Sequence, residues 1–176
     1  MGTASGLFYT KGVHAVGVDE IISTTPTTRA TFYRHFPSKD DLIVAYIQGT
    51  DQQIRDDLAA ALRNPTSPDS GVRAIAHYVA RQIKTAGFRG CAFLNAAAEY
   101  PHADDPIRKA IQTHRRWYYE TIRNEFRRVT DERAELAAKH FVMLRDGAMV
   151  AGYLGEPAAA GGTFLRGCQA VIRARA

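Results

Sequence analysis

The segment Thr28-Arg29-Ala30-Thr31-Phe32-Tyr33-Arg34-His35-Phe36-Pro37-Ser38-Lys39 mixes hydrogen-bond donors with aromatic rings. Thr28 is a favourable N-cap residue and Pro37 stops a helix, so we predict a helix over residues 29–36. A helix of about two turns buries little surface by itself. Its polar side chains face outward and its phenylalanines inward. It therefore suits presentation to a partner, as the second helix of a helix-turn-helix is presented to the DNA major groove.

The composition is that of a globular protein. With 45% hydrophobic and 23% charged residues among 176, the chain is long enough for one or two domains with a core. The net charge of +5 is compatible with an anionic partner but does not identify one. Cys91 and Cys168 form neither a CxxC motif nor a Cys/His cluster, so we expect no metal site. We find no signal peptide and no membrane-spanning run, and we expect a cytoplasmic protein.

Apolar residues recur at helical spacing along the chain, and alternating strand patterns are scarce. We therefore predict an all-α fold of about nine helices. The predicted helices cover residues 3–11, 19–24, 29–36, 38–62, 72–85, 91–99, 104–129, 132–153 and 163–175. Residues 64–69 and 155–162 are predicted loops. We place a three-helix helix-turn-helix head at residues 1–46 and a larger helical body at residues 47–176.

Two motifs resemble the TetR family of transcriptional regulators. The first runs from Val18-x-x-Ile21-Ile22 through residues 28–36 to Lys39-x-x-Leu42 and is similar to the DNA-binding head of that family. The second, at residues 90–101, reads GCAFLNAAAEYP and is similar to the stretch that opens the ligand-binding region in one branch. The resemblance implies a repressor that binds palindromic operator DNA as a homodimer. It further implies release by an unknown small, largely apolar ligand, and we expect no cofactor.

The resemblance assigns DNA contacts to the outer side of the short helix and to the lysine that follows it. Thr28 would meet a phosphate at the helix N-terminus, and Lys39 would hold the DNA backbone by its charge. Phe32 and Phe36 would pack inward. The predicted DNA-contacting set is Thr28, Arg29, Ala30, Thr31, Tyr33, Arg34, His35 and Lys39. A surface helix whose donors are only solvated is the alternative.

The turn before this helix departs from the family pattern. The family usually has Ala-Gly-Val where this chain has Thr25-Pro26-Thr27. Glycine permits a left-handed turn that proline, with φ near about −65°, cannot adopt, so the turn must be rebuilt. The first helix is also shorter than is usual in the family, and the charges of residues 1–50 balance. These departures support an alternative: a small-molecule-binding helical protein of the same descent with weakened or lost DNA binding.

Aromatic residues gather in the body. By resemblance to the family, some of them would line a mostly apolar pocket that also offers a few polar groups. The candidate pocket residues are Phe88, Phe93, Asn95, Tyr100, His114, Trp117, Tyr118 and Phe141. Ordinary core packing is the alternative for each of them, and for His114 a hydrogen-bonded core position. Cys91 is either a small buried residue or a redox-sensitive thiol.

Small residues on the last two helices favour close packing and a two-fold four-helix dimer interface. The candidate interface residues are Leu144, Ala148, Ala151, Gly152, Leu165, Ala170 and Val171, with packing inside a monomer as the alternative. We find no phosphate-binding loop, nucleophile elbow or HExxH motif, so we expect no catalytic residues and no enzyme. Glu99 with His102 or His114 is the only conceivable acid–base set, and nothing in the sequence specifies it.

Overall fold

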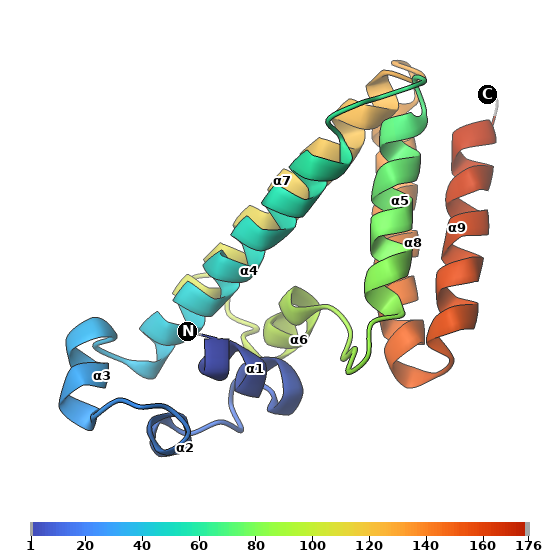
Figure 1. Cartoon of the computed structure of the whole chain (residues 1–176). Helices are drawn as coiled ribbons and strands as arrows, with labels where there is room; N and C mark the ends of the chain where they lie inside the picture. Colours follow the sequence, from blue (N-terminus) through green and yellow to red (C-terminus); the bar gives the residue numbers. More distant parts are fainter. Residues whose placement is uncertain (1, 175–176) are drawn as a thin grey trace. The chain divides into compact units, whose positions relative to one another are not determined.

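The computed structural model describes residues 2–174, which form nine helices and no strand (Figure 1). The helices are α1 (Gly2–Lys11), α2 (Val18–Ser23), α3 (Arg29–His35), α4 (Lys39–Ala61), α5 (Ser70–Ile83), α6 (Ala92–Glu99), α7 (Pro106–Arg127), α8 (Ala134–Leu154) and α9 (Pro157–Arg173). The predicted all-α fold is confirmed. Except for the start of α9, the predicted helix ends that fall within the described residues lie within two residues of the observed ones, and the end predicted at residue 175 lies outside the described residues. Within the described range, no helix is long and apolar enough to cross a membrane.

The helices are grouped into two compact units that interleave in sequence. The first unit contains the chain up to Gln53 together with Ala92–His114. The second unit contains Ile54–Cys91 together with the chain from Arg115 onward. Because α4 and α7 run through both units, no single cut of the sequence separates them. The predicted boundary at residue 46 stays a prediction.

Helices α4 and α7 lie against each other inside each unit. In the first unit, His114 Nδ1 of α7 is 2.7 Å from Asp51 Oδ1 of α4. In the second unit, the Arg55 guanidinium of α4 lies 4.1 Å over the Trp117 ring of α7. A buried histidine–aspartate contact and a cation–π contact thus fix the pairing of the two long helices.

Apolar residues at helical spacing hold the first unit together. Ala4 and Phe8 are one turn apart on α1, and both are buried. α2 and α3 each bury one residue: Ile21 and Phe32. On α4 the buried residues of this unit are Leu42, Ile43, Tyr46 and Ile47. Full burial of one large apolar side chain stabilises a fold by roughly 1.5–3 kcal/mol. The Phe8 ring of α1 lies 5.6 Å from the Tyr46 ring of α4, so this core joins the two helices.

Two local features set the ends of α1 and α4. α1 ends at Gly12, whose φ of 92° is in the left-handed region that glycine tolerates. The Gly12 N–H donates to the Phe8 carbonyl at 3.0 Å. α4 begins with a reciprocal cap: Ser38 Oγ accepts from the Asp41 N–H at 3.1 Å, and Asp41 Oδ2 accepts from the Ser38 N–H at 2.9 Å. The prediction that Ser38 caps this helix is confirmed.

In the second unit α5, α8 and α9 pack side by side (Figure 1). α5 contributes an apolar stripe at helical spacing that contains Val72, Ile75, Ala76, Val79 and Ile83. An aromatic row joins α7, α8 and α9. The Phe141 ring lies 6.2 Å from Phe126 and 5.5 Å from Phe164, both edge-on. Such contacts add stability beyond the area they bury.

The start of α9 corrects one prediction. Residues 155–162 are a predicted loop, but α9 begins at Pro157. Proline is favourable at the first helical position, and the alanines after it are strong helix formers. A Cβ on Gly161 would lie 3.4 Å from the Ala80 carbonyl oxygen. Gly161 therefore marks a close approach of α9 to α5 inside a helix, and its presence does not signal a loop.

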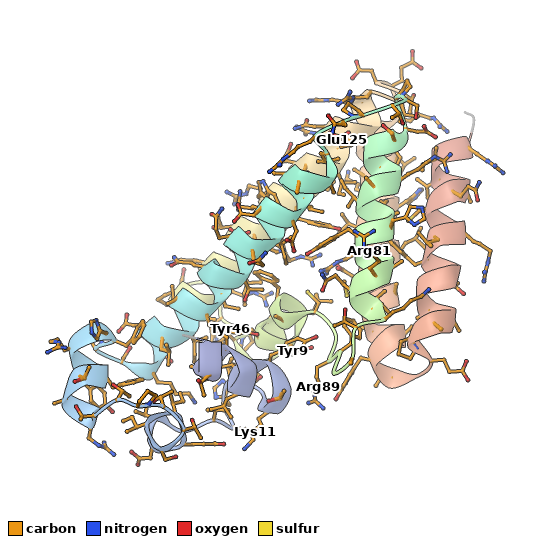
Figure 2. The ribbon with its side chains drawn as sticks, viewed as in Figure 1. Tyr9, Lys11, Tyr46, Arg81, Arg89 and Glu125 are labelled. Atoms are coloured by element: carbon orange, nitrogen blue, oxygen red, sulfur yellow. The ribbon has the colours of Figure 1, made fainter. Side chains whose placement is uncertain are left out.

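The N-terminal end of α5 also needs a glycine. Figure 2 shows Glu125 on α7 beside this end of α5. A Cβ on Gly71, in the first turn of α5, would collide with the Glu125 carboxylate. A carboxylate is favourable at a helix N-terminus, where backbone N–H groups lack partners inside the helix. Gly71 thus leaves room for Glu125 at this position.

We expect Gly152→Ala to destabilise the protein by about 1–3 kcal/mol, the usual cost of overpacking. A Cβ on Gly152 would lie 2.5 Å from Ile83 Cγ2 and 3.3 Å from Phe88 Cε1, in a buried position. Gly49→Ala on α4 is the matched control, because a Cβ there has no neighbour within 4 Å. This control should be neutral or stabilising by up to about 1 kcal/mol. Urea denaturation of the two variants measures both effects, and equal midpoints would contradict the packing described for Gly152.

Candidate nucleic-acid interface and body site

Helix α3 is short and is held by one cap and one buried ring. Thr28 Oγ1 accepts from the Thr31 N–H at 3.1 Å, so the predicted N-cap is confirmed. The Thr28 hydroxyl donates in turn to Thr31 Oγ1 at 3.0 Å. Phe32 is 6% exposed, and its ring lies 6.0 Å from that of Phe36. The phenylalanine side of α3 is therefore its inner side, as predicted.

The remaining predicted DNA-contacting residues lie on the outer part of the short helix or beside it. Tyr33 is 41% exposed although it is a large aromatic residue. The other exposed members of the set are Thr28, Arg29, Ala30, Arg34 and His35, whereas Thr31 and Lys39 are half-buried. α3 thus presents two cations, an imidazole and a phenol on one short surface, which is the donor set that protein–DNA contacts use.

Two of the predicted DNA contacts are engaged inside the protein. Arg29 Nη2 forms an ion pair with Asp19 Oδ1 of α2. Lys39 Nζ donates to the His14 carbonyl at 3.2 Å. Asp19 and Arg29 are both well exposed, so water screens their attraction and the pair contributes little to stability. Arg29 is consequently available to exchange its partner, whereas Lys39 also holds the turn after α1.

The turn at Pro26 is rebuilt without a left-handed residue. Among the described residues, positive φ angles occur only at Gly12, Gly87 and Gly90. The Thr27 N–H donates to the Thr25 carbonyl at 2.8 Å, which closes a three-residue turn around Pro26. Such a turn needs a central φ near about −75°, within reach of proline. Thr25 Oγ1 further donates to the Ile21 carbonyl at 2.8 Å. The predicted rebuilding is confirmed, and hydroxyl and proline geometry replace the usual glycine.

A carboxylate that the sequence left without a clear role fastens α6 to the turn after α1. Glu99, at the end of α6, accepts from the N–H of Val13 at 3.1 Å and from the N–H of His14 at 2.7 Å. The Glu99 carbonyl is 3.1 Å from His14 Nε2, and the His14 ring stacks on Tyr100 at 4.9 Å. Both carboxylate oxygens of Glu99 thus accept from backbone N–H groups of the turn after α1. Because these partners are 86 and 85 residues away in the sequence, helical spacing does not predict this contact.

The predicted pocket residues are divided between the two units. In the first unit, Phe93 and His114 are buried and stack face to face, with ring centroids 3.6 Å apart. His114 Nδ1 is also the group that contacts Asp51. Tyr100 is 9% exposed, and Asn95 lies on the exposed surface of α6. His114 thus occupies the hydrogen-bonded core position that was the alternative for it.

The other four candidates lie in the second unit. Phe141 is the centre of the aromatic row and has no exposed surface. Phe88 is half-buried, and Trp117 is half-buried beneath Arg55. Tyr118 is 5% exposed, and burial raises the pKa of its hydroxyl to about 12, so it is a neutral group at neutral pH.

A polar cluster that the sequence analysis missed surrounds Tyr118. Arg145 of α8 is 6% exposed, and its guanidinium lies 5.4 Å over the Tyr118 ring. Its Nη1 donates to Asp146 Oδ1 at 2.9 Å and to Cys91 Sγ at 3.2 Å. Helical spacing could have indicated this cluster, because Arg145 lies one turn after Phe141 in the apolar stripe of α8. Cys168, by contrast, is a neutral thiol, since burial raises its pKa to about 12.

An apolar groove of about 780 Å³ runs along α8 and α9. Met143 and Leu144 on its α8 side are 71% and 37% exposed. The groove contains four of the seven predicted interface residues: Leu144, Ala148, Ala151 and Val171. Gly152 lies elsewhere, buried against Ile83 of the same chain, because close packing with α5 needs a residue without a side chain. Leu165 lines a separate small cavity beside Arg73 and His77 of α5, and Ala170 is exposed.

Within the described part of the chain, no group of three or more His, Cys, Asp or Glu side chains could hold a metal ion. The exposed short helix, the buried polar cluster and the apolar groove are therefore the features from which function can be argued. None of them contains a nucleophile paired with a base.

The sequence matches two family models. Residues 1–46 match the model described as "Bacterial regulatory proteins, tetR family". Residues 70–155 match the model described as "Tetracyclin repressor-like, C-terminal domain".

Several known proteins are similar to the chain. SCO4454, a TetR-family transcriptional regulator from Streptomyces coelicolor, is 46% identical with a TM-score of 0.95, over 98% of this chain and 91% of the other. A TetR-family regulator from Agrobacterium tumefaciens is 23% identical with a TM-score of 0.83, over 98% and 94% of the two chains. HTH-type transcriptional regulator LmrA of Bacillus subtilis is 26% identical over 129 residues, which are 70% of this chain and 69% of the relative.

We expect Glu99→Ala to destabilise the first unit by about 1–3 kcal/mol, because two backbone N–H groups lose their acceptor. Glu99→Gln keeps one acceptor oxygen and should lose less. Hydrogen exchange at the amides of Val13 and His14 measures the effect directly and should accelerate in the order wild type, Gln, Ala. Glu132→Ala, at an exposed site in the second unit, is the control. Unchanged exchange in Glu99→Ala would contradict the role assigned to Glu99.

Proposed function

The chain belongs to the TetR family of bacterial transcriptional regulators, and from this membership we propose that it is a ligand-responsive repressor that binds palindromic operator DNA as a homodimer. As a TetR-family regulator with a helix-turn-helix, it is a DNA-binding protein and not an enzyme. The observation that carries the proposal is α3, a short helix that buries Phe32 and exposes Arg29, Tyr33, Arg34 and His35. We place its action in the cytoplasm, where bacterial operator DNA lies.

On DNA, α3 would enter the major groove and direct its outer side chains to base edges and phosphates. Tyr33, Arg34 and His35 supply donors, and Arg29 would leave Asp19 for a DNA group of greater negative potential. The rebuilt turn at Pro26 supports this function over the alternative of lost DNA binding. It joins α2 to α3 through a hydrogen-bonded turn that needs no left-handed residue, which supports a helix-turn-helix that still functions.

The homodimer would form through the apolar groove of α8 and α9. The groove holds large side chains such as Met143 that are exposed in the single chain, and a second copy would cover them. Two copies related by a two-fold axis would present two α3 helices to successive major grooves, about 34 Å apart.

Ligand release would act through helices shared by the two units. α4 and α7 run through both, and Glu99 fastens α6 to the turn between α1 and α2. A ligand in the second unit that favours one arrangement of α7 would therefore bias the geometry of α6 and of the helix-turn-helix. The ligand would lower operator affinity by its preference for the arrangement in which the two α3 helices no longer match successive grooves.

We expect Arg34→Ala to weaken binding to the DNA upstream of the protein's own gene by about tenfold, the cost of one good DNA contact. A phosphate contact would also lower the slope of log affinity against log salt by about 1. Arg63→Ala, exposed after α4, removes the same charge away from α3 and is the control. Mobility-shift titrations at several salt concentrations measure both quantities. Equal affinity of the two variants would refute the placement of α3 in the groove.

We expect Met143→Glu to convert the dimer to a monomer, because two carboxylates would be buried in the apolar interface. Leu136→Glu is the matched control, since Leu136 is 55% exposed on the same helix but does not line the groove. Sedimentation equilibrium gives the mass of each variant. A dimer that survives Met143→Glu and dissociates with Leu136→Glu would place the interface elsewhere.

A further inference from the structure

Arg145 is an unusual member of the α8 inner face. This face is otherwise apolar at helical spacing, with Ala134, Ala138, Phe141 and Ala148 buried. Among the described residues, His114 in the first unit and Arg145 in the second are the only buried side chains that can carry a positive charge. Arginine is almost never fully buried without compensation, so its position in this stripe calls for an explanation.

The charge of Arg145 is only partly compensated. Asp146 Oδ1 accepts from Arg145 Nη1 at 2.9 Å, and Asp146 Oδ2 accepts from Arg115 Nη2 at 2.7 Å. One carboxylate thus serves two guanidinium groups, which leaves one positive charge in excess within this set. Burial, the largest effect, lowers the pKa of Arg145. Cys91, Tyr118 and Asp146 more than offset it, so the pKa lies above its ordinary value and the group stays charged.

The hydrogen bonds of Arg145 are also incomplete. Its Nε is buried and donates to no acceptor. Its second contact through Nη1 is Cys91 Sγ at 3.2 Å, and a thiol is a weak acceptor. A buried guanidinium normally has charged or carbonyl acceptors for most of its donors. An anionic oxygen would both accept a hydrogen bond from Arg145 Nε and balance the excess positive charge.

We propose that Arg145 binds the carboxylate of an amphipathic organic acid, which is the effector of this regulator. A planar carboxylate matches the guanidinium fork and would supply the acceptor that Nε lacks. The Tyr118 ring, over which the guanidinium lies, suits an aromatic or aliphatic remainder of the same molecule. The inference rests on the proposed function, since it names the chemical class of the ligand assumed there.

The test compares acids with neutral isosteres on the full-length protein. The probes are octanoate against octanamide and benzoate against benzamide, and the readouts are thermal shift and the fluorescence of Trp117, the only tryptophan. The variants are Arg145→Met, Arg145→Lys and, as control, Arg173→Met at an exposed site on α9. If Arg145→Met does not fold, the comparison of acid with amide binding in the wild type and in Arg145→Lys still tests the inference.

We expect at least one acid to bind the wild type about tenfold or more tightly than its amide, the advantage of a charge-assisted contact. Arg173→Met should keep this preference, Arg145→Lys should reduce it, and Arg145→Met should abolish it. Equal binding of acid and amide, a preference that survives in Arg145→Met, or no binding of either acid would overturn the inference.

A separate readout distinguishes failure of the inference from failure of the proposed function. Each probe is added to the preformed complex with upstream DNA, and release is followed by mobility shift. An acid that binds through Arg145 without releasing DNA would support the carboxylate site and refute ligand-driven release. Release by a neutral compound, with no acid bound, would support the regulator and refute the carboxylate site.

Discussion

Helix α3 has seven residues, and a helix of that length is not stable by itself in water. It exists because Phe32 is buried in the first unit and because the Thr28 side chain accepts from the Thr31 N–H. These two interactions fix which side of the helix faces outward. The orientation of the exposed side of α3 therefore depends on one aromatic ring on the opposite side of the helix.

The orientation of α3 depends on backbone contacts that precede it in the chain. Pro26 suits the three-residue turn that joins α2 to α3, and threonine hydroxyls fill the hydrogen bonds around it. Earlier in the chain, the turn between α1 and α2 is held to the end of α6 by hydrogen bonds to Glu99. The helix-turn-helix is thus fastened to a helix outside it, a connection that a regulator can use to transmit a change from its body.

Sequence patterns predicted the features that repeat or that have strong local chemistry. The helices with apolar spacing, the caps at Thr28 and Ser38 and the inward Phe32 are all present as predicted. The predicted loop at residues 155–162 is wrong because α9 already begins at Pro157, and Gly161 accommodates a close approach to α5 inside that helix. The roles of Glu99 and Arg145 were not predicted, because their partners are distant in sequence. The spacing of aromatic residues in the sequence likewise does not distinguish a core residue such as Phe141 from a residue that contacts a ligand.

If a dimer of this chain reads DNA with two α3 helices, footprinting on the DNA upstream of its gene should show two protected, symmetry-related half-sites. The half-sites should lie on one face of the duplex, with centres about 10 base pairs or a whole number of helical turns apart. A single unpaired footprint, or uniform weak protection without sequence preference at concentrations where the protein is dimeric, would contradict this mode of binding.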